Sequence, residues 1–413
     1  MITLLADDLS GAQEAFAAAA DLPETSTTAA GLLLLDADAV PAHGPEVLAV
    51  DLDARRLEPG AAAAALRRGL ARLSRSRRRD GPLVVKIDSL LRGPVAALLG
   101  ALVETAPVVL CPAVPALGRT VEGGRPLVQG TPLAQTGLWA VEPCAPPSAV
   151  GDLAPHLDPE TIALVEVRGH ELPERLAAAV GRTRLVVADA ATDADCTAIA
   201  RAASPLGVVL VGAAGLARAA GSLQRAGSPA TAPSDGSRTG AASAVRSAPV
   251  AVVVGSAAGT ARDQVRELAD QGVPVLSWRP GVELAPPAGP EADVVLVLDA
   301  PFDPDRADQL NAEFADAVAA AVPGHHLVLT GGQTARAVLD RLGVARLHPL
   351  SQPHHGAVLA AAGDGRLVAT RPGSFGGRDS LLTLRTALRA AVPADPRAAR
   401  RRAQTPFTRG PAA

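Results

Sequence analysis

The chain has 413 residues, which is enough for more than one hydrophobic core, and we expect two domains. Its net charge of −3 excludes a global attraction to nucleic acid or to an anionic membrane. Its three cysteines are far apart, which argues against a disulfide scaffold, and the first residues lack the basic start of a signal peptide. We therefore expect a cytoplasmic protein.

Short apolar runs in the first half predict strands separated by helices. These runs cover residues 2–6, 32–36, 47–52, 82–87, 107–112, 184–189 and 207–212. A helix is predicted over 10–21, with Ser10 as its N-cap. Because the runs are continuously apolar, they are typical of a parallel sheet buried on both faces.

Residues 224–247 are rich in Ser, Gly, Ala and Pro and predict a flexible linker. After it, strands are predicted at 250–256, 273–278, 293–299, 326–332 and 366–370, with helices at 304–321 and 334–342. The fold expected is therefore α/β, with two domains of mainly parallel sheet (1–223 and 248–392), the active site in the cleft between them and a disordered tail (393–413).

Polar side chains follow several predicted strands of the first half. They are Asp7 and Asp8, then Asp51, Asp53 and Arg55, then Lys86, Asp88, Ser89 and Arg92, and then Arg119. Ligands of open α/β sheets collect at the carboxyl ends of the strands. Cations that bind a carboxylate, beside acids that bind hydroxyls, predict a pocket for a sugar acid.

Lys86 is the only lysine among 39 cationic residues. It follows three apolar strand residues, and a compact ammonium fits a tight site that the arginine fork does not. The alternatives stay open: Lys86 could form a surface ion pair with Asp88, and each motif by itself also fits a capped helix, a charged loop or an ordinary turn.

Three Gly-rich turns mark the second half: Val252–Thr260, Leu329–Thr334 and Arg371–Ser380. Glycines before a helix expose backbone N–H groups to an anion, so three such turns predict a nucleotide site. Lys86 follows a valine, which excludes a Walker A loop, and no G-x-G-x-x-G follows a strand.

The motifs "LLADDLSGA", "VDLDARRL", "VVKIDSLLRG", "CPAVPALGRT", "VVVGSAAGTARDQ", "LTGGQTARAVLDRLGV" and "PGSFGGRDSLL" resemble, in this order, the four-carbon acid sugar kinases. The resemblance implies an ATP-dependent kinase acting on a hydroxyl, in the family generally the terminal one, of a tetronate or oxo-tetronate. It implies a sugar-acid pocket lined by Asp7, Asp8, Arg55, Lys86, Asp88, Ser89, Arg92 and Arg119. It also implies ATP contacts at Ser256, Gly331, Gly332, Gln333, Thr334, Gly373 and Gly376.

For the mechanism, we expect Asp8 or Asp88 to orient the attacking hydroxyl and take its proton, with Lys86 close to the transferred phosphoryl group and Mg²⁺ on the phosphates. The acid sugar and ATP are the partners expected, and a homodimer stays open.

Two other functions also stay open. Gln333 and Arg371 depart from the usual family residues, which would suit a sugar-acid sensor with a decayed ATP site, and "DLDARR" distantly resembles the loop of an aspartyl phosphatase.

Overall fold

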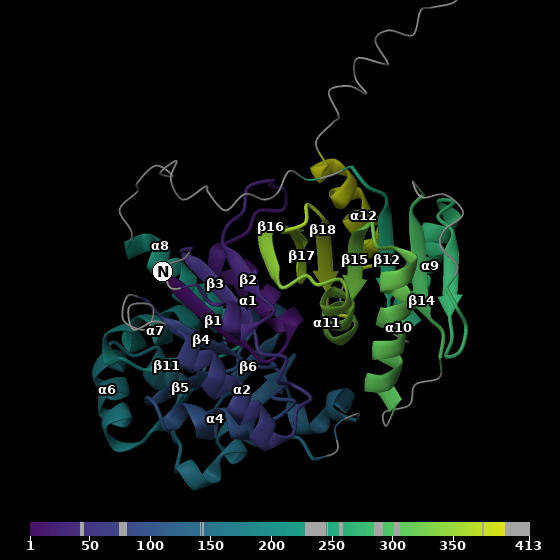
Figure 1. Cartoon of the computed structure of the whole chain (residues 1–413). Helices are drawn as coiled ribbons and strands as arrows, with labels where there is room; N and C mark the ends of the chain where they lie inside the picture. The colour runs from purple at the N-terminus through teal and green to yellow at the C-terminus, as the bar shows by residue number, and fades with distance from the viewer. Residues whose placement is uncertain are drawn as a thin grey trace, which may run out of the picture.

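The computed structural model describes residues 1–41, 45–73, 81–140, 142, 144–227, 245, 247–255, 259–284, 292–300, 306–373 and 376–392. Within these ranges, 15 strands form one continuous sheet and three short strands form a second, smaller sheet. Figure 1 shows the two halves of the chain side by side, with helices on both faces of the large sheet. The α/β fold class is confirmed.

The first half contributes eight parallel strands to the large sheet. In sheet order they are β2 (Leu32–Leu34), β3 (Val47–Asp51), β1 (Ile2–Ala6), β4 (Leu83–Lys86), β11 (Val209–Gly212), β5 (Val108–Cys111), β10 (Leu185–Ala188) and β9 (Glu160–Ile162). The small antiparallel sheet is β6 (Arg119–Glu122), β7 (Arg125–Val128) and β8 (Thr131–Pro132).

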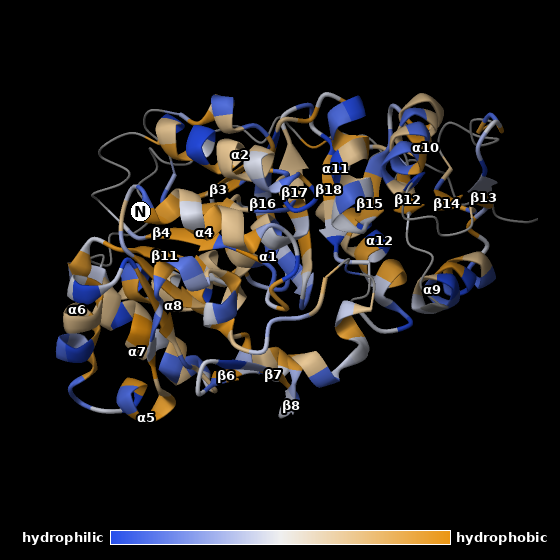
Figure 2. Ribbon diagram, turned by 90° about the horizontal axis from the view of Figure 1, so that it is seen from below, coloured by the Kyte–Doolittle hydropathy of each residue, from blue (hydrophilic) through white to orange (hydrophobic). Residues whose placement is uncertain are grey.

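The helices of this half are α1 (Leu9–Ala20), α2 (Pro59–Arg72), α4 (Val95–Val103), α5 (Leu164–Val167), α6 (Leu172–Arg182), α7 (Asp193–Ala203) and α8 (Ala214–Gly227). Helix α8 packs against α1 and α7, while α2 packs against α4. β1, β3 and β5 are buried along their whole length, as their continuous apolar sequences predict. In Figure 2 the strands are accordingly mostly hydrophobic, and hydrophilic residues lie on the outer helices.

The second half adds seven strands. They are β13 (Val275–Trp278), β14 (Val294–Leu298), β12 (Val250–Val254), β15 (His326–Thr330), β18 (Leu367–Arg371), β17 (Ala357–Ala362) and β16 (Arg346–His354). Its helices are α9 (Gly259–Asp270), α10 (Ala307–Ala321), α11 (Gly332–Arg341) and α12 (Ser380–Ala391). Helix α10 packs against α11, and α9 packs against α12.

The predicted linker is not the only connection between the two halves, because both halves contribute strands to the same sheet. β16 pairs antiparallel with β2, Leu347 opposite Leu33, and a single apolar core continues from one half into the other. The predicted linker also starts too early, because residues 224–227 belong to α8. Most of its remainder, and the whole predicted tail 393–413, lie outside the described residues.

The antiparallel strands between the two halves determine the direction in which the carboxyl ends of the parallel strands point. Three antiparallel pairings (β18 with β17, β17 with β16, and β16 with β2) separate the parallel strands of the two halves, which therefore run in opposite directions. β1 and β15 are six pairings apart, and a twist of roughly 20–25° per pairing turns them by roughly 120–150° relative to each other. Because the two strands are antiparallel before this rotation, it brings the carboxyl ends of β1 and β15 to the same side of the sheet, where Gly332 lies against Ser10. In the described part of the chain, we find no helix with the length and apolarity that crossing a bilayer requires.

Candidate active site

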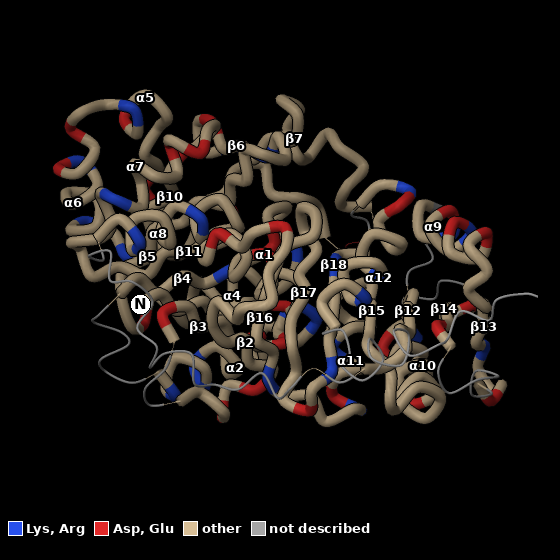
Figure 3. The backbone as a smooth tube through the Cα atoms, turned by 90° about the horizontal axis from the view of Figure 1, so that it is seen from above, with Lys and Arg blue, Asp and Glu red and all other residues tan. Residues whose placement is uncertain are grey.

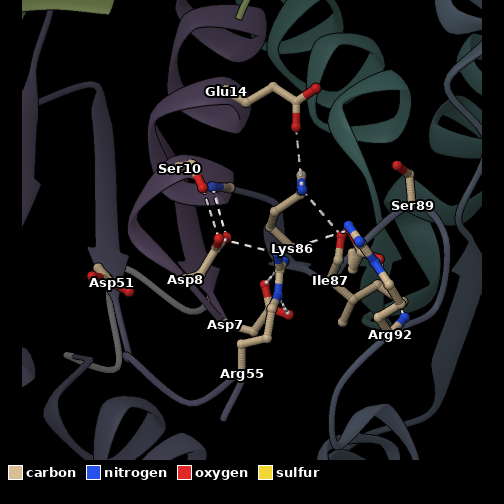
Figure 4. A network of polar contacts seen from close by, with 12 residues as sticks. Asp7, Asp8, Ser10, Glu14, Asp51, Arg55, Lys86, Ile87, Ser89 and Arg92 are labelled. Atoms are coloured by element: carbon tan, nitrogen blue, oxygen red, sulfur yellow. Dashed lines mark hydrogen bonds and ion pairs between the residues drawn. The ribbon is translucent and has the colours of Figure 1, made fainter. Parts of the chain in front are cut away.

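The site begins where β1 ends and α1 starts. Asp8, rather than the predicted Ser10, is the N-cap of α1: its Oδ1 accepts from the backbone N of Gly11 at 2.8 Å. Ser10 instead donates its hydroxyl to Asp8 Oδ2 at 2.7 Å. The Asp8 carboxylate is partly exposed and is held in one orientation (Figure 4).

Arg55, from the loop after β3, forms the centre of the cluster. Its Nε and Nη2 donate to both oxygens of Asp7, at 2.9 and 2.8 Å, and its Nη1 donates to Asp8 Oδ2 at 3.0 Å. Burial by itself would lower the pKa of Arg55, but the charges of Asp7, Asp8 and Asp88 raise it well above its usual value. Asp7 is completely buried behind this guanidinium, so it faces the site only through Arg55.

Lys86 ends β4 and is buried, with 3% of its side chain exposed. Its Nζ lies 3.3 Å from Glu14 Oε2 of α1 and donates to the Ile87 carbonyl oxygen at 3.1 Å. The proposed surface ion pair with Asp88 is therefore wrong. Gly11 leaves the space for this ammonium, because a Cβ there would lie 3.2 Å from Nζ. Figure 4 shows Lys86 reaching up between α1 and β4 to Glu14.

Asp88 and Arg92 form a second pair beside Arg55. Arg92 Nε and Nη2 donate to the two oxygens of Asp88 at 2.6 and 3.1 Å, and Arg55 Nη1 lies 3.8 Å from Asp88 Oδ1. Burial favours the neutral acid, but the hydrogen bonds from Arg92 and the charges of Arg55 and Lys86 outweigh it and hold the pKa of Asp88 well below its usual range. Asp88 is thus a fixed carboxylate with little tendency to accept a proton.

Arg119, the first residue of β6, donates through Nη1 to the hydroxyl of Ser89. Burial lowers the pKa of Arg119, and no carboxylate among the described residues forms an ion pair with it.

The glycines that follow Arg119 in this segment have a structural role instead. Gly123 and Gly124 donate their backbone N–H groups to Asp189, at 2.5 and 2.8 Å, in the turn between β6 and β7.

The start of α11 faces this cluster from the second half. A Cβ added to Gly332 would lie 2.6 Å from Ser10 Oγ and 3.2 Å from Asp8 Oδ2. Gly331, the N-cap of α11, has a φ of 84°, which favours glycine. The two predicted clusters therefore meet at Gly332 and Ser10. In Figure 1, α11 lies between the halves, and in Figure 3 acidic and basic residues lie along the backbone near α1.

Two family models match this chain: a sugar-binding N-terminal domain over residues 2–220 and a nucleotide-binding C-terminal domain over residues 297–381. The D-threonate kinase of Cupriavidus necator is 33% identical, and the match covers 92% of this chain and 95% of that protein. The chain belongs to the four-carbon acid sugar kinase family. It is therefore a phosphotransferase with an alcohol group as acceptor.

Further relatives agree with this membership. A D-threonate kinase of Bordetella bronchiseptica is 31% identical over 94% of this chain and 97% of its own length, and a 3-oxo-tetronate kinase of Cupriavidus necator is 29% identical over 70% and 73%. A solved structure from Salmonella typhimurium, titled a putative tRNA synthase, has a TM-score of 0.70 and 19% identity, with 93% of this chain and 98% of that chain covered. At this identity the structure supports the fold alone.

The nucleotide residues that the family resemblance implied occupy different settings. The Gln333 side chain is exposed, and its amide oxygen can accept from Arg56 Nε at 2.8 Å. Thr334 is buried, donates its hydroxyl to Asn311 at 2.8 Å and packs against Gly255. Ser256 lies outside the described residues. The backbone of Gly332 is thus the part of this set that directly faces Ser10 and Asp8.

The last Gly-rich turn is built around Arg371 and Gln264. Arg371 is buried at the end of β18, where it donates to Gln264 and to the carbonyl oxygens of Pro372 and Gly373, and burial lowers its pKa to about 10. Gln264 in turn donates to the carbonyl oxygens of Gly376 and Gly377 at 3.3 and 2.8 Å. Buried side chains therefore hold the described residues on both sides of this turn, 371–373 and 376–377.

Sequence analysis missed several members of the site. Ser10, Glu14, Asn311 and Arg336 were not predicted as site residues. His354, which ends β16, was not predicted either and contacts Ser380 Oγ at 2.8 Å. Glu14 carried one signal. It lies three residues after Gly11 on the predicted helix, and therefore on the same helical face.

Proposed function

We propose that the chain transfers the γ-phosphoryl group of ATP to a hydroxyl of a four-carbon acid sugar. The observation that carries this proposal is the approach of Gly332, at the start of α11, to Ser10 and Asp8, at the start of α1. Phosphoryl transfer depends above all on holding the acceptor hydroxyl in line with the phosphate. This junction brings a helix amino terminus, which favours phosphate, against a carboxylate that can orient a hydroxyl.

The carboxylate of the acid sugar binds Arg119 and Ser89 in this proposal. Among the described residues Arg119 has no carboxylate partner, whereas Arg55, Lys86 and Arg92 each contact a protein carboxylate. A half-buried guanidinium with no carboxylate in direct contact is well suited to a ligand carboxylate. The acid sugar then extends from Arg119 towards Asp8, with its reacting hydroxyl near Gly332.

Asp8 is the group that we propose to orient the hydroxyl and accept its proton. Asp8 is partly exposed and lies next to Gly332, while Asp88 is held by two hydrogen bonds from Arg92 and has a depressed pKa. Asp88 would instead position Arg92 and Arg55. Asp7 acts through Arg55, and Lys86 supplies positive charge from beneath the site.

The residues present fit the triphosphate of ATP. No atom lies within 4 Å of the position that a Cβ would take at Gly331, and the first-turn N–H groups of α11 have no acceptor within the helix. Mg²⁺ supplies charge neutralisation when it is bound to these phosphates.

An ADP-release assay over linear tetronates, oxo-tetronates and branched acids of the same class tests the proposal. We expect ADP release that depends on one of these acids. Asp8→Asn should lower kcat by about 10²- to 10⁴-fold without weakening ATP binding, whereas Asp88→Asn should mainly raise the KM for the acid sugar.

The same assay addresses the two other functions. Acid-sugar binding without any nucleotide binding in calorimetry would favour the sensor and refute the kinase. The phosphatase hypothesis needs a carboxylate after β3 that is available as a nucleophile. Asp51, however, is buried and bonded to Arg336 and to the backbone N of Asp53, which argues against it.

A further inference from the structure

Two positions of helix α11, its first residue Gly332 and Arg336, contact the first half of the protein. Gly332 faces Asp8 and Ser10. Arg336 lies four residues after Gly332, which is about one helical turn and about 6 Å along the axis. Whatever holds Arg336 in place therefore also sets the position of the helix start.

Arg336 is held by the other half of the protein. Its Nη1 donates to Asp51 Oδ2 at 2.8 Å, across 285 residues of sequence, and its Nε lies 3.0 Å from both oxygens of Asp340. Asp51 ends β3, and its Oδ1 accepts from the backbone N of Asp53 at 2.9 Å. The guanidinium thus bridges its own helix and a rigid strand end of the first half.

Burial makes the contact between Asp51 and Arg336 energetically costly to break. The Asp51 side chain is completely buried and that of Arg336 is 17% exposed. Burial raises the pKa of Asp51 to about 7, Arg336 opposes this rise, and Asp53 adds to it. Removing Arg336 would leave Asp51 as a buried carboxyl group without its counter-charge, which costs much more than losing an exposed pair.

An exposed ion pair between the same two halves provides a comparison. Arg56 Nε lies 3.0 Å from Asp308 Oδ1, but these side chains are 46% and 72% exposed. Two such mobile side chains can shift without moving the helices that carry them, so this pair contributes little to positioning. The buried pair between Asp51 and Arg336 is the more rigid of the two.

We propose that Asp51 and Arg336 are positioning residues that set the start of α11 against Asp8, and thereby the alignment of the phosphoryl donor with the acceptor hydroxyl. This inference rests on the proposed function for its catalytic consequence. Neither residue touches a substrate in this proposal. Their effect should therefore appear in turnover rather than in the affinity for either substrate.

Kinetics of Asp51→Asn, Arg336→Gln and the double variant test this inference, with Asp308→Asn as the matched control. Because a misplacement of about 1 Å can cost about 100-fold in rate, each single variant should lower kcat by about 10- to 100-fold and change each substrate's Kd by less than about threefold. Asp308→Asn should keep the wild-type kcat. Wild-type kcat in both single variants would overturn the proposal.

The double variant separates alignment from folding. It leaves no unpaired charge between the two halves, so its melting temperature should lie above that of at least one single variant. Its kcat should remain low, because the bridge from β3 to α11 is still missing. A double variant with wild-type kcat would overturn the proposal, since the single variants would then have failed through buried charge alone.

Hydrogen exchange gives a readout that does not depend on kinase activity. Both single variants should speed amide exchange in the first turn of α11 and over residues 8–11, while Asp308→Asn should not. Unchanged exchange at these amides would overturn the positioning role even if the kinetics were altered. Absence of ATP consumption by the wild type would refute the proposed function, but the exchange experiment would still test this inference.

Discussion

A methyl group at position 332 probes the junction between the two halves most directly. In Gly332→Ala the new Cβ would lie 2.6 Å from Ser10 Oγ, whereas ordinary contacts begin near 3.4 Å. Either the hydroxyl or the start of α11 must therefore move by about 0.8 Å. Rotation of Ser10 would not relieve the strain fully, because Asp8 Oδ2 would also lie only 3.2 Å from the methyl group and rotation would break the Ser10–Asp8 hydrogen bond.

The expected effect follows from this displacement. Overpacking of this kind costs about 1–3 kcal/mol of stability. A shift approaching 1 Å between donor and acceptor can lower the rate by on the order of 100-fold. We therefore expect a loss of kcat of that order in a variant that remains folded at the assay temperature.

The assay is ADP release under saturating ATP and acid sugar, with two comparison variants. Gly181→Ala in α6 is the matched control, because no atom lies within 4 Å of a Cβ there, and it should keep full activity. Ser10→Ala combined with Gly332→Ala removes the nearest clashing atom and leaves the Ser10 Cβ at 3.5 Å, so part of the activity should return. If Gly332→Ala keeps a kcat within about threefold of wild type, the two clusters do not jointly hold the reactants, and the reasoning fails.

Three further predictions concern charged groups. Lys86→Arg should lower kcat by on the order of 100-fold, because the space beside Gly11 and Glu14 fits an ammonium group rather than a guanidinium. An unchanged kcat in the ADP-release assay would show that Lys86 has no role in phosphoryl transfer. Arg119→Gln should raise the KM for the acid sugar by about 10- to 100-fold, because a hydrogen bond to a charged group contributes about 1.5–3 kcal/mol. The KM for ATP should not change. An equal rise in both KM values would contradict the role of Arg119 in binding the acid sugar. Burial raises the pKa of Asp51 from 3.8 to about 7, so its contribution to stability is complete below pH 3.8 and is lost as the pH rises through about 7. Urea unfolding should then show that the wild type loses more stability than Asp51→Asn between pH 5 and pH 8, and equal losses would refute this pKa.

Local sequence was enough to predict most strands of both parallel regions, but the short edge strand β9 (Glu160–Ile162) was missed. β1, β3, β12 and β15 are short continuous apolar runs, and a strand buried on both faces requires such a run wherever it lies in the sheet. The polar residues that follow these strands were predictable for the same reason, since the carboxyl ends of neighbouring parallel strands share one edge.

The strands that join the halves gave a weaker signal. β16 reads "RLHPLSQPH", with two prolines and two histidines, and its pairing with β17 has register shifts near Pro349 and Ser351. Neither apolar continuity nor alternation marks it as a strand. The single continuous sheet was therefore missed, although it determines how the two parallel regions are oriented.

What the sequence alone determined is thus the set of elements and the chemical groups at their ends, because both depend on neighbours within a few residues. The partners of those groups were decided only by the tertiary structure. Lys86 pairs with Glu14 rather than Asp88, and Asp51 pairs with Arg336 from the other half. An ion pair depends on separations of a few ångströms in space, and these are set by how the helices dock on a twisted sheet rather than by spacing along the chain.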